Sequence, residues 1–120
     1  MPRVLLVDDD PAMLRLLEVN FRLEGFETAT ASRGEEAVDA VRTRTPDALV
    51  LDVMLPGMDG HEVVRAIRDD PDLAELPVVF LTGRTTDDPR FAAPGVAVLG
   101  KPFDPQELVG LVRARIGSPA

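Results

Sequence analysis

Short apolar runs alternate along this chain with segments that repeat an apolar residue every three or four positions. Four runs, at 4–7, 48–51, 78–81 and 96–99, contain only Val, Leu, Ala and Phe. Apolar runs of this length that end at turn residues are typical of strands buried on both faces of a parallel sheet. A less apolar strand is predicted at 26–31, so the pattern indicates five strands.

The segments between the strands have helical periodicity and begin at capping residues. Asp10 before Pro11 is typical of a helix N-cap followed by the first helical residue. Asp59 stands in the same way before a later helix. We therefore predict helices that begin near residues 11, 34, 60 and 104, each after a strand.

The pattern fails between Thr82 and Gly95, where a fourth crossover helix would be expected. This segment contains Pro89, Pro94 and two adjacent aspartates. These residues oppose a long helix. We predict a short helix or a mobile loop over residues 84–94.

Strands that alternate with helices form βαβ units, with helices on both faces of the sheet. Five such strands favour a flavodoxin-like (βα)5 three-layer α/β sandwich with the strand order 2-1-3-4-5. In this order the first and third strands are neighbours, so we expect Asp8 and Asp9 to face Asp52. Thr82 and Lys101, at the ends of the fourth and fifth strands, are expected to approach from the other side.

The length, net charge and composition of the chain exclude several classes of protein. The 120 residues fit a single domain over 1–120, with a frayed tail at 117–120. A formal net charge of −8 opposes direct binding to nucleic acid, and the lack of cysteine excludes disulfides and thiolate metal sites. No apolar run approaches the ~20 residues of a membrane span. No signal peptide precedes the strand that begins at Arg3, so we expect a cytoplasmic protein that does not contact the membrane.

Oxygen ligands at the predicted strand ends indicate a divalent metal site. Crowded carboxylates need a compensating charge, and Mg²⁺ prefers oxygen ligands and often shares its site with a phosphate. We assign the side-chain ligands first to Asp9 and Asp52, with Asp8 acting through water or as a weaker ligand. The main-chain carbonyl of Met54 is expected to complete the protein ligands, and Mn²⁺ is an alternative ion.

Asp52 is placed to attack phosphorus and form an acyl phosphate. The transferring phosphoryl group needs its equatorial oxygens neutralised. The Lys101 ammonium and the Thr82 hydroxyl are expected to contact two of these oxygens. The peptide bond between Lys101 and Pro102 is predicted to be cis.

These residues lie in four motifs that together resemble the receiver domain of two-component response regulators. The motifs are the pair Asp8-Asp9, the segment 51–60 around Asp52, Leu81-Thr82-Gly83, and Lys101-Pro102-Phe103. The resemblance covers nearly the whole chain. It implies Mg²⁺-dependent transfer of a phosphoryl group to Asp52 from a sensor histidine kinase or histidine phosphotransfer protein, followed by slow self-hydrolysis. It also implies a signalling domain that acts on a downstream output protein or domain, not an enzyme with a separate substrate.

Two features depart from the pattern of this family: one residue of the fifth strand, and the stretch from Thr82 to Lys101, which is a few residues short and interrupted by proline. Three residues before the lysine the family usually has Tyr or Phe, whereas this chain has Val98, which is too short to move in behind Thr82. We therefore expect phosphorylation to persist with an atypical readout, in which an order–disorder change in residues 84–94 replaces the movement of the aromatic side chain. Arg84 and Met54 are expected to flank the mouth of the pocket.

Two other functions fit parts of the sequence. Val98 and the broken fourth crossover also suit a receiver fold that serves only as a phosphorylation-independent docking module. Asp8 and Asp10 also resemble the nucleophile and the acid of haloacid-dehalogenase phosphatases, although Asp52 would then have no role. His61, the only histidine, is expected on the surface at the start of a helix.

Overall fold

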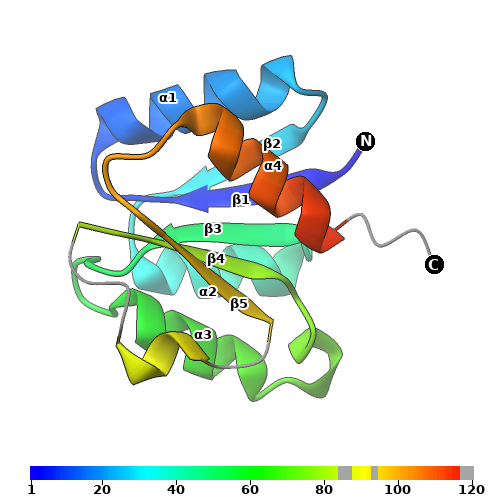
Figure 1. Cartoon of the computed structure of the whole chain (residues 1–120). Coiled ribbons are helices and arrows are strands. Elements are labelled where there is room, and N and C mark those ends of the chain that lie inside the picture. Colours follow the sequence, from blue (N-terminus) through cyan, green and yellow to red (C-terminus); the bar gives the residue numbers. More distant parts are fainter. Residues whose placement is uncertain (84–87, 93–94, 117–120) are drawn as a thin grey trace.

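A five-stranded parallel sheet lies between two layers of helices in the computed structural model, which describes residues 1–83, 88–92 and 95–116 (Figure 1). The strand order is β2-β1-β3-β4-β5, as the sequence predicts. The strands are β1 (Arg3–Val7), β2 (Glu27–Ala31), β3 (Ala48–Asp52), β4 (Val78–Thr82) and β5 (Val96–Gly100).

The helices are α1 (Pro11–Leu23), α2 (Gly34–Thr43), α3 (Gly60–Arg68) and α4 (Pro105–Ile116), with 3-10 turns η1 (Pro71–Leu73) and η2 (Pro89–Ala92). Helices α1 and α3 begin at the predicted capping residues, whereas α2 follows Arg33, which forms no side-chain capping hydrogen bond. Asp10 caps the first helix by accepting a hydrogen bond from the Ala12 N–H at 2.9 Å. Asp59 and Glu62 form a reciprocal capping box at the start of the third.

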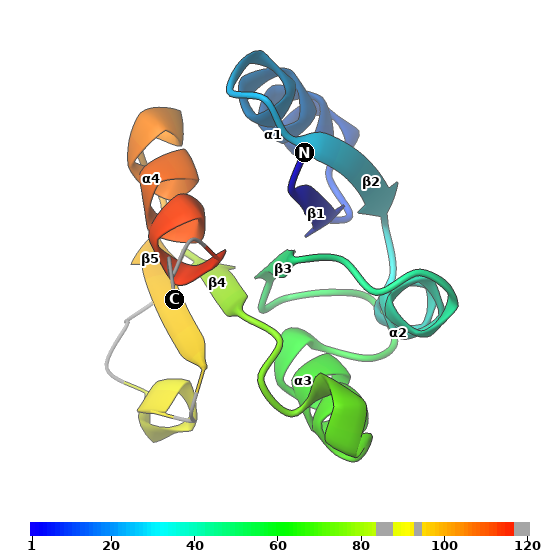
Figure 2. The ribbon, with the colours of Figure 1, turned by 90° about the vertical axis from the view of Figure 1, so that its right-hand side faces the viewer.

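Each face of the sheet has its own apolar core. Helices α1 and α4 cover one face, and α2 and α3 cover the other, which is clearest when the molecule is turned by 90° (Figure 2). The residues of β3 and β4 are buried along their whole length. A central strand buried on both faces has no solvated side, which explains why its sequence is a continuous apolar run instead of an alternating one.

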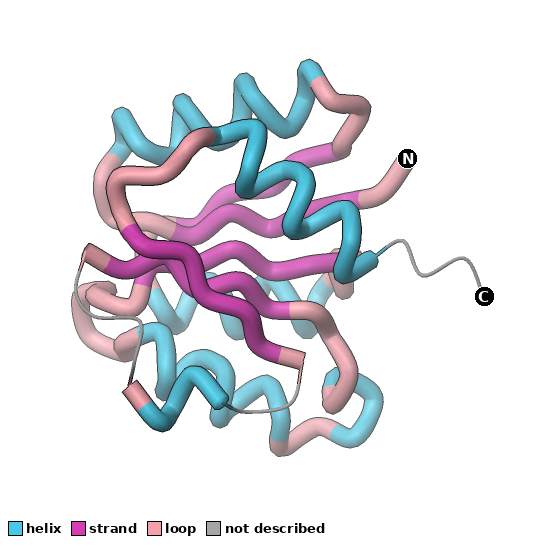
Figure 3. Tube along the Cα trace, viewed as in Figure 1, coloured by secondary structure: helices cyan, strands magenta, loops and turns pink. Residues whose placement is uncertain are grey.

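The crossover from β4 to β5 contains no long helix in its described residues. Only η2, over Pro89–Ala92, has helical geometry, and it packs beside β5 (Figure 3). This agrees with the expected short helix. The expectations for Arg84, for an order–disorder change at positions 84–87 and 93–94, and for the tail at 117–120 concern residues outside the described ranges.

The expectation that His61 lies on the surface is wrong. It does begin α3, but only 8% of the residue is exposed. Its ring packs against Phe80 and Phe91, with centroid distances of 5.0 Å and 5.2 Å. The preceding Gly60 brings the start of α3 so close to the sheet that a Cβ there would lie 2.8 Å from the Asp52 carbonyl oxygen. This close approach places the next side chain under η2 instead of in solvent.

Candidate functional site

The carboxyl ends of the strands bring the predicted site residues to one edge of the sheet. Asp8 follows β1 directly, and Asp52 is the last residue of the neighbouring β3. Asp52 is in register with Leu81 of β4, so Thr82 extends one residue beyond it. The Lys101 N–H, just after β5, donates to the Thr82 carbonyl at 2.7 Å, which aligns the last two strand ends.

Lys101 connects the two sides of this edge. Its Nζ lies 2.9 Å from Asp52 Oδ2 and 3.5 Å from Asp8 Oδ2. Burial of the ammonium lowers its pKa, but the hydrogen bond to Asp52 and the charges of Asp52 and Asp8 outweigh burial and raise the pKa of Lys101 above its ordinary value. The lysine is therefore a fixed cation at the site. The bond from Lys101 to Pro102 is cis, as predicted.

Asp8 is the most deeply buried carboxylate of the site, with 1% of the residue exposed. Its Oδ1 accepts a hydrogen bond from the Asp10 N–H at 2.9 Å. Its Oδ2 is buried and accepts no hydrogen bond of standard geometry from the described residues, so Lys101 is its nearest recorded cation. Burial raises the pKa of the Asp8 carboxyl, and the Asp52 charge adds to this, although the Asp10 N–H and Lys101 oppose it.

Asp52 is held at both of its oxygens. The Met54 N–H donates to Oδ1 at 3.0 Å, while Lys101 binds Oδ2. Together these contacts set the rotation of the carboxylate at the mouth of the site. Met54 was expected to supply its carbonyl and to flank the mouth of the pocket. The hydrogen bond from its N–H to Asp52 was not predicted, although it too follows from the position of Met54 two residues after Asp52.

The third carboxylate, Asp9, is exposed, yet it belongs to the same cluster. One oxygen from each of Asp8, Asp9 and Asp52 can be chosen so that all three lie within 4.8 Å of one another. Three carboxylates against one ammonium leave a net negative charge, and no described residue donates a hydrogen bond to the buried Asp8 Oδ2. Hard oxygen donors with an uncompensated buried charge suit a divalent cation such as Mg²⁺.

Val98 lies away from this cluster on β5. It is partly buried, is in register with Phe80, and packs against the core on the α2 and α3 side of the sheet. Val98 therefore stands beside the ring cluster of His61, Phe80 and Phe91 and makes no recorded contact with the three carboxylates.

In the part of the chain that the structure describes, no helix has both the length and the hydrophobicity of a membrane span.

A family model for the response regulator receiver domain matches residues 4–113. Curated relatives include the DNA-binding response regulator MtrA of Mycolicibacterium smegmatis, which is 44% identical over 95% of this chain and 50% of that protein. The phosphate regulon transcriptional regulatory protein PhoB of Rhizobium meliloti is 38% identical over 97% of this chain and 52% of that protein. The chain thus spans about half the length of the curated relatives it matches.

Solved structures share the whole fold. The receiver domain of the sensor histidine kinase PA1611 from Pseudomonas aeruginosa, described with a magnesium ion coordinated in its active site cleft, superposes with a TM-score of 0.89 at 29% identity and covers 98% of each chain. The chemotaxis response regulator CheY4 of Vibrio cholerae gives a TM-score of 0.89 at 30% identity, covering 96% of this chain and 98% of that one.

Proposed function

This chain belongs to the response regulator receiver domain family, and from that premise we propose that Asp52 accepts a phosphoryl group from a phosphohistidine. The observation that carries the proposal is the placement of Lys101 Nζ 2.9 Å from Asp52 inside a cluster of three carboxylates. An ammonium in that position supports both the ionised nucleophile and the charge of an incoming phosphoryl group.

The proposed transfer forms one bond and breaks one. An Asp52 oxygen attacks phosphorus, the phosphorus–nitrogen bond of the donor breaks, and the imidazole leaves with the bonding electron pair. Lys101 neutralises one phosphoryl oxygen, and the buried Thr82 hydroxyl donates to another. Attack by water on phosphorus later releases inorganic phosphate and restores the Asp52 carboxylate.

Asp8, Asp9 and Asp52 would hold Mg²⁺, and the Met54 carbonyl is proposed as a further ligand, with Mn²⁺ as an alternative. The bound ion supplies positive charge to the transferring phosphoryl group. The chain itself excludes bulk water from Asp8, which is buried, and leaves Asp9 exposed toward the entering donor. Asp8 Oδ2 accepts no hydrogen bond from the described residues and has Lys101 Nζ 3.5 Å away, so the ion would give it a second cationic partner.

The partners follow from the same proposal. The donor is a sensor histidine kinase or a histidine phosphotransfer protein, and the recipient is a downstream output protein or domain. We propose that residues 1–120 form one receiver domain, which makes no direct contact with nucleic acid or membrane.

Val98 cannot supply an aromatic switch. We therefore propose that the phosphorylation signal passes through the β4–β5 crossover, where Phe91 packs on Phe80.

Intact mass after incubation with a small-molecule phosphodonor tests the proposal. The wild-type chain should gain one phosphoryl group only when Mg²⁺ is present, and Asp52→Asn should gain none. Asp39→Asn is the matched control, because Asp39 is an exposed carboxylate on α2, and it should behave as the wild type does.

Two results would contradict the proposal in different ways. A gain that persists in Asp52→Asn would move the nucleophile to another carboxylate, as in the phosphatase alternative that uses Asp8. Absence of both phosphorylation and Mg²⁺ binding in the wild type would favour a docking module that works without phosphorylation.

A further inference from the structure

The only histidine of the chain joins three elements of the fold at a distance from the carboxylate cluster. The ring of His61, on α3, packs against Phe80 of β4 and Phe91 of η2, with centroid distances of 5.0 Å and 5.2 Å. The rings of Phe80 and Phe91 also contact each other, at 5.4 Å. This ring cluster holds η2 against the sheet face that α2 and α3 cover.

The ring cluster suits a neutral imidazole and not a charged one. Only 8% of His61 is exposed, and its buried Nε2 has no hydrogen-bond partner among the described residues. A neutral imidazole has one N–H, whereas the imidazolium donates from both nitrogens. Protonation would therefore leave a charged donor buried without an acceptor, which is costly.

The charged groups that face His61 do not offset this cost. Asp59 and Arg65 lie on the α3 side, Asp88 and Arg90 lie on the η2 side, and β4 and β5 contain no ionisable side chain. Burial lowers the pKa of His61, and the charges of Arg90 and Arg65 lower it further, while Asp59 and Asp88 oppose this.

The start of α3 is fixed to the sheet, so His61 cannot move out easily. The Gly60 N–H donates to the Val53 carbonyl at 2.8 Å, just beyond the end of β3. The capping box of Asp59 and Glu62 adds two hydrogen bonds at the same turn. Moving the imidazole into water by shifting α3 would break these contacts.

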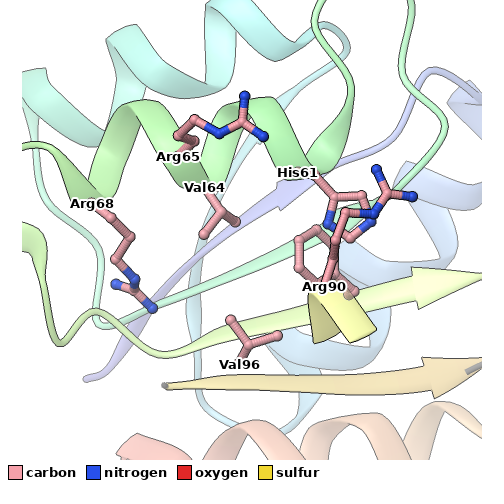
Figure 4. A pocket seen from close by; sticks show the side chains of 7 residues that line it. His61, Val64, Arg65, Arg68, Arg90 and Val96 are labelled. Carbon is pink, nitrogen blue, oxygen red and sulfur yellow. The ribbon is translucent and has the colours of Figure 1, made fainter. Parts of the chain in front are cut away.

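The turn η2, on the other side of the ring cluster, is held less firmly. Its Phe91 N–H donates to the Asp88 carbonyl at 3.0 Å, and Arg90 pairs with Asp88 at 2.7 Å. Within residues 1–83, 88–92 and 95–116, no recorded hydrogen bond joins η2 to another element. A pocket of about 250 Å³ also opens beside His61 and Arg90, so the packing between η2 and α3 is incomplete (Figure 4).

We propose that protonation of His61 releases η2 from the sheet, so that mild acid opens the β4–β5 crossover while the rest of the fold stays intact. Once Phe91 leaves the ring cluster, water can accept hydrogen bonds from both imidazolium nitrogens. The pKa of His61 then returns to its ordinary value of about 6.5. Because the packed state binds fewer protons than the released one, η2 should detach increasingly as the pH falls below this value.

The consequence for signalling rests on the proposed function. If the phosphorylation signal passes through the β4–β5 crossover, acid and phosphorylation act on the same element of the chain. The release of η2 itself depends only on His61 and on the contacts of the ring cluster.

NMR of the full chain with ¹³C in the phenylalanine rings tests the release. Between about pH 7.5 and about pH 5, the ring resonances of Phe91 and Phe80 should shift. Relaxation dispersion should show the equilibrium constant for release rising by up to about thirtyfold, the ratio for an ordinary imidazole pKa in the released state only. Phe21 and Phe26, which pair at 5.0 Å on the opposite face of the sheet, should not shift.

His61→Leu assigns the response to the imidazole, because leucine is apolar and does not titrate. The pH dependence at Phe91 should disappear in this variant, and His61→Phe repeats the comparison if leucine packs poorly. Any response that came from Asp8, whose pKa is raised, would persist in both variants. Asp39→Asn removes an exposed carboxylate of α2 and should respond to pH as the wild type does.

Four results would overturn the proposal. Equal shifts at Phe91 and Phe21 would indicate unfolding of the whole chain, and an unchanged response in His61→Leu would exclude the imidazole as its source. Titration of His61 without movement of Phe91 would show that the packed cluster accommodates the charge. No change at Phe91 down to about pH 5 would exclude release by mild acid. No phosphoryl donor enters the experiment, so its outcome and that of the Asp52 test are independent.

Discussion

At the level of a single residue, the buried negative charge of Asp8 lowers the stability of the folded chain. Its carboxylate is buried, one oxygen has no hydrogen-bond donor among the described residues, and the nearest cation stands 3.5 Å away. Burial of an ionised group without full compensation destabilises the folded state. Unless a further cation binds, the charge on Asp8 therefore opposes folding near neutral pH.

Asp8→Asn should therefore raise the free energy of unfolding at pH 7 in the absence of divalent metal, by about 1 kcal/mol. Because the pKa of Asp8 is raised in the folded chain, that chain binds more protons than the unfolded one between the two pKa values. Stability of the wild type thus falls as pH rises through this interval. The advantage of the variant should vanish below about pH 3, where Asp8 is protonated in both states.

Urea denaturation across this pH range, with Asp39→Asn as the control, measures the effect. An advantage that stayed constant at low pH would mean that ionisation of Asp8 is not its source.

Lys101 is the only lysine in the chain, so its titration can be followed without assignment. Its pKa is raised because contact with Asp52 and Asp8 outweighs burial of the ammonium. The lysine signal of ¹³C-dimethylated protein should therefore titrate above the value of a free side chain, and Asp52→Asn should bring it down. An unchanged titration in Asp52→Asn, or the same fall in Asp39→Asn, would contradict the observed pairing.

Strand-end position was sufficient to predict which polar residues share one edge of the sheet. Asp8, Asp52, Thr82 and Lys101 each follow an apolar run, and parallel order brings such ends to one edge. The burial of His61 was not predictable in this way. It depends on how closely α3 approaches the sheet, which is a tertiary distance and leaves no periodic signal in the sequence.

At the level of elements, the close contact between α3 and β3 can be tested by substitution. A Cβ on Gly60 would lie 2.8 Å from the Asp52 carbonyl oxygen and 2.9 Å from Phe80 Cε1. Neither the strand backbone nor a fully buried ring can move away easily. Gly60→Ala should therefore lower the free energy of unfolding by about 2 kcal/mol.

Gly110→Ala is the matched control, because Gly110 lies inside α4 and a Cβ there would meet nothing within 4 Å. This substitution should stabilise the chain by about 0.5–1 kcal/mol through helix propensity. Thermal unfolding followed by circular dichroism compares the two. Equal changes in the free energy of unfolding for Gly60→Ala and Gly110→Ala would contradict the close packing of α3 against β3.

The β4–β5 crossover could be predicted from the sequence only in part. Proline and paired aspartates correctly exclude a long helix, and the described part is the short turn η2. Phe91 nevertheless belongs to the core, with 9% of the residue exposed. No periodic segment surrounds Phe91, so the sequence alone could not assign this side chain to the sheet face.

At the level of the whole molecule, negative charge and the metal site should act together on stability. The chain has a net charge of −8, and three carboxylates gather at the end of β1 and β3. Mg²⁺ at about ten times its dissociation constant should raise the free energy of unfolding by about 1.4 kcal/mol. This gain should exceed that of NaCl at equal ionic strength, which screens general repulsion only.

Asp9→Asn and Asp52→Asn should each lose most of the Mg²⁺-specific gain but keep the response to NaCl. Chemical denaturation in the two salts separates these contributions. Equal responses of all variants to both salts would indicate that Mg²⁺ acts on this protein only through ionic strength.

The sequence distance between the partners of the site has a consequence for biosynthesis. Lys101 follows Asp52 by 49 residues, and Asp8 lies near the start of the chain. A ribosome releases the chain from its N-terminus, so all three carboxylates emerge well before their single ammonium. We expect the nascent sheet to need dissolved divalent cations to bring β1 and β3 together, and to lose that dependence once β5 has left the exit tunnel.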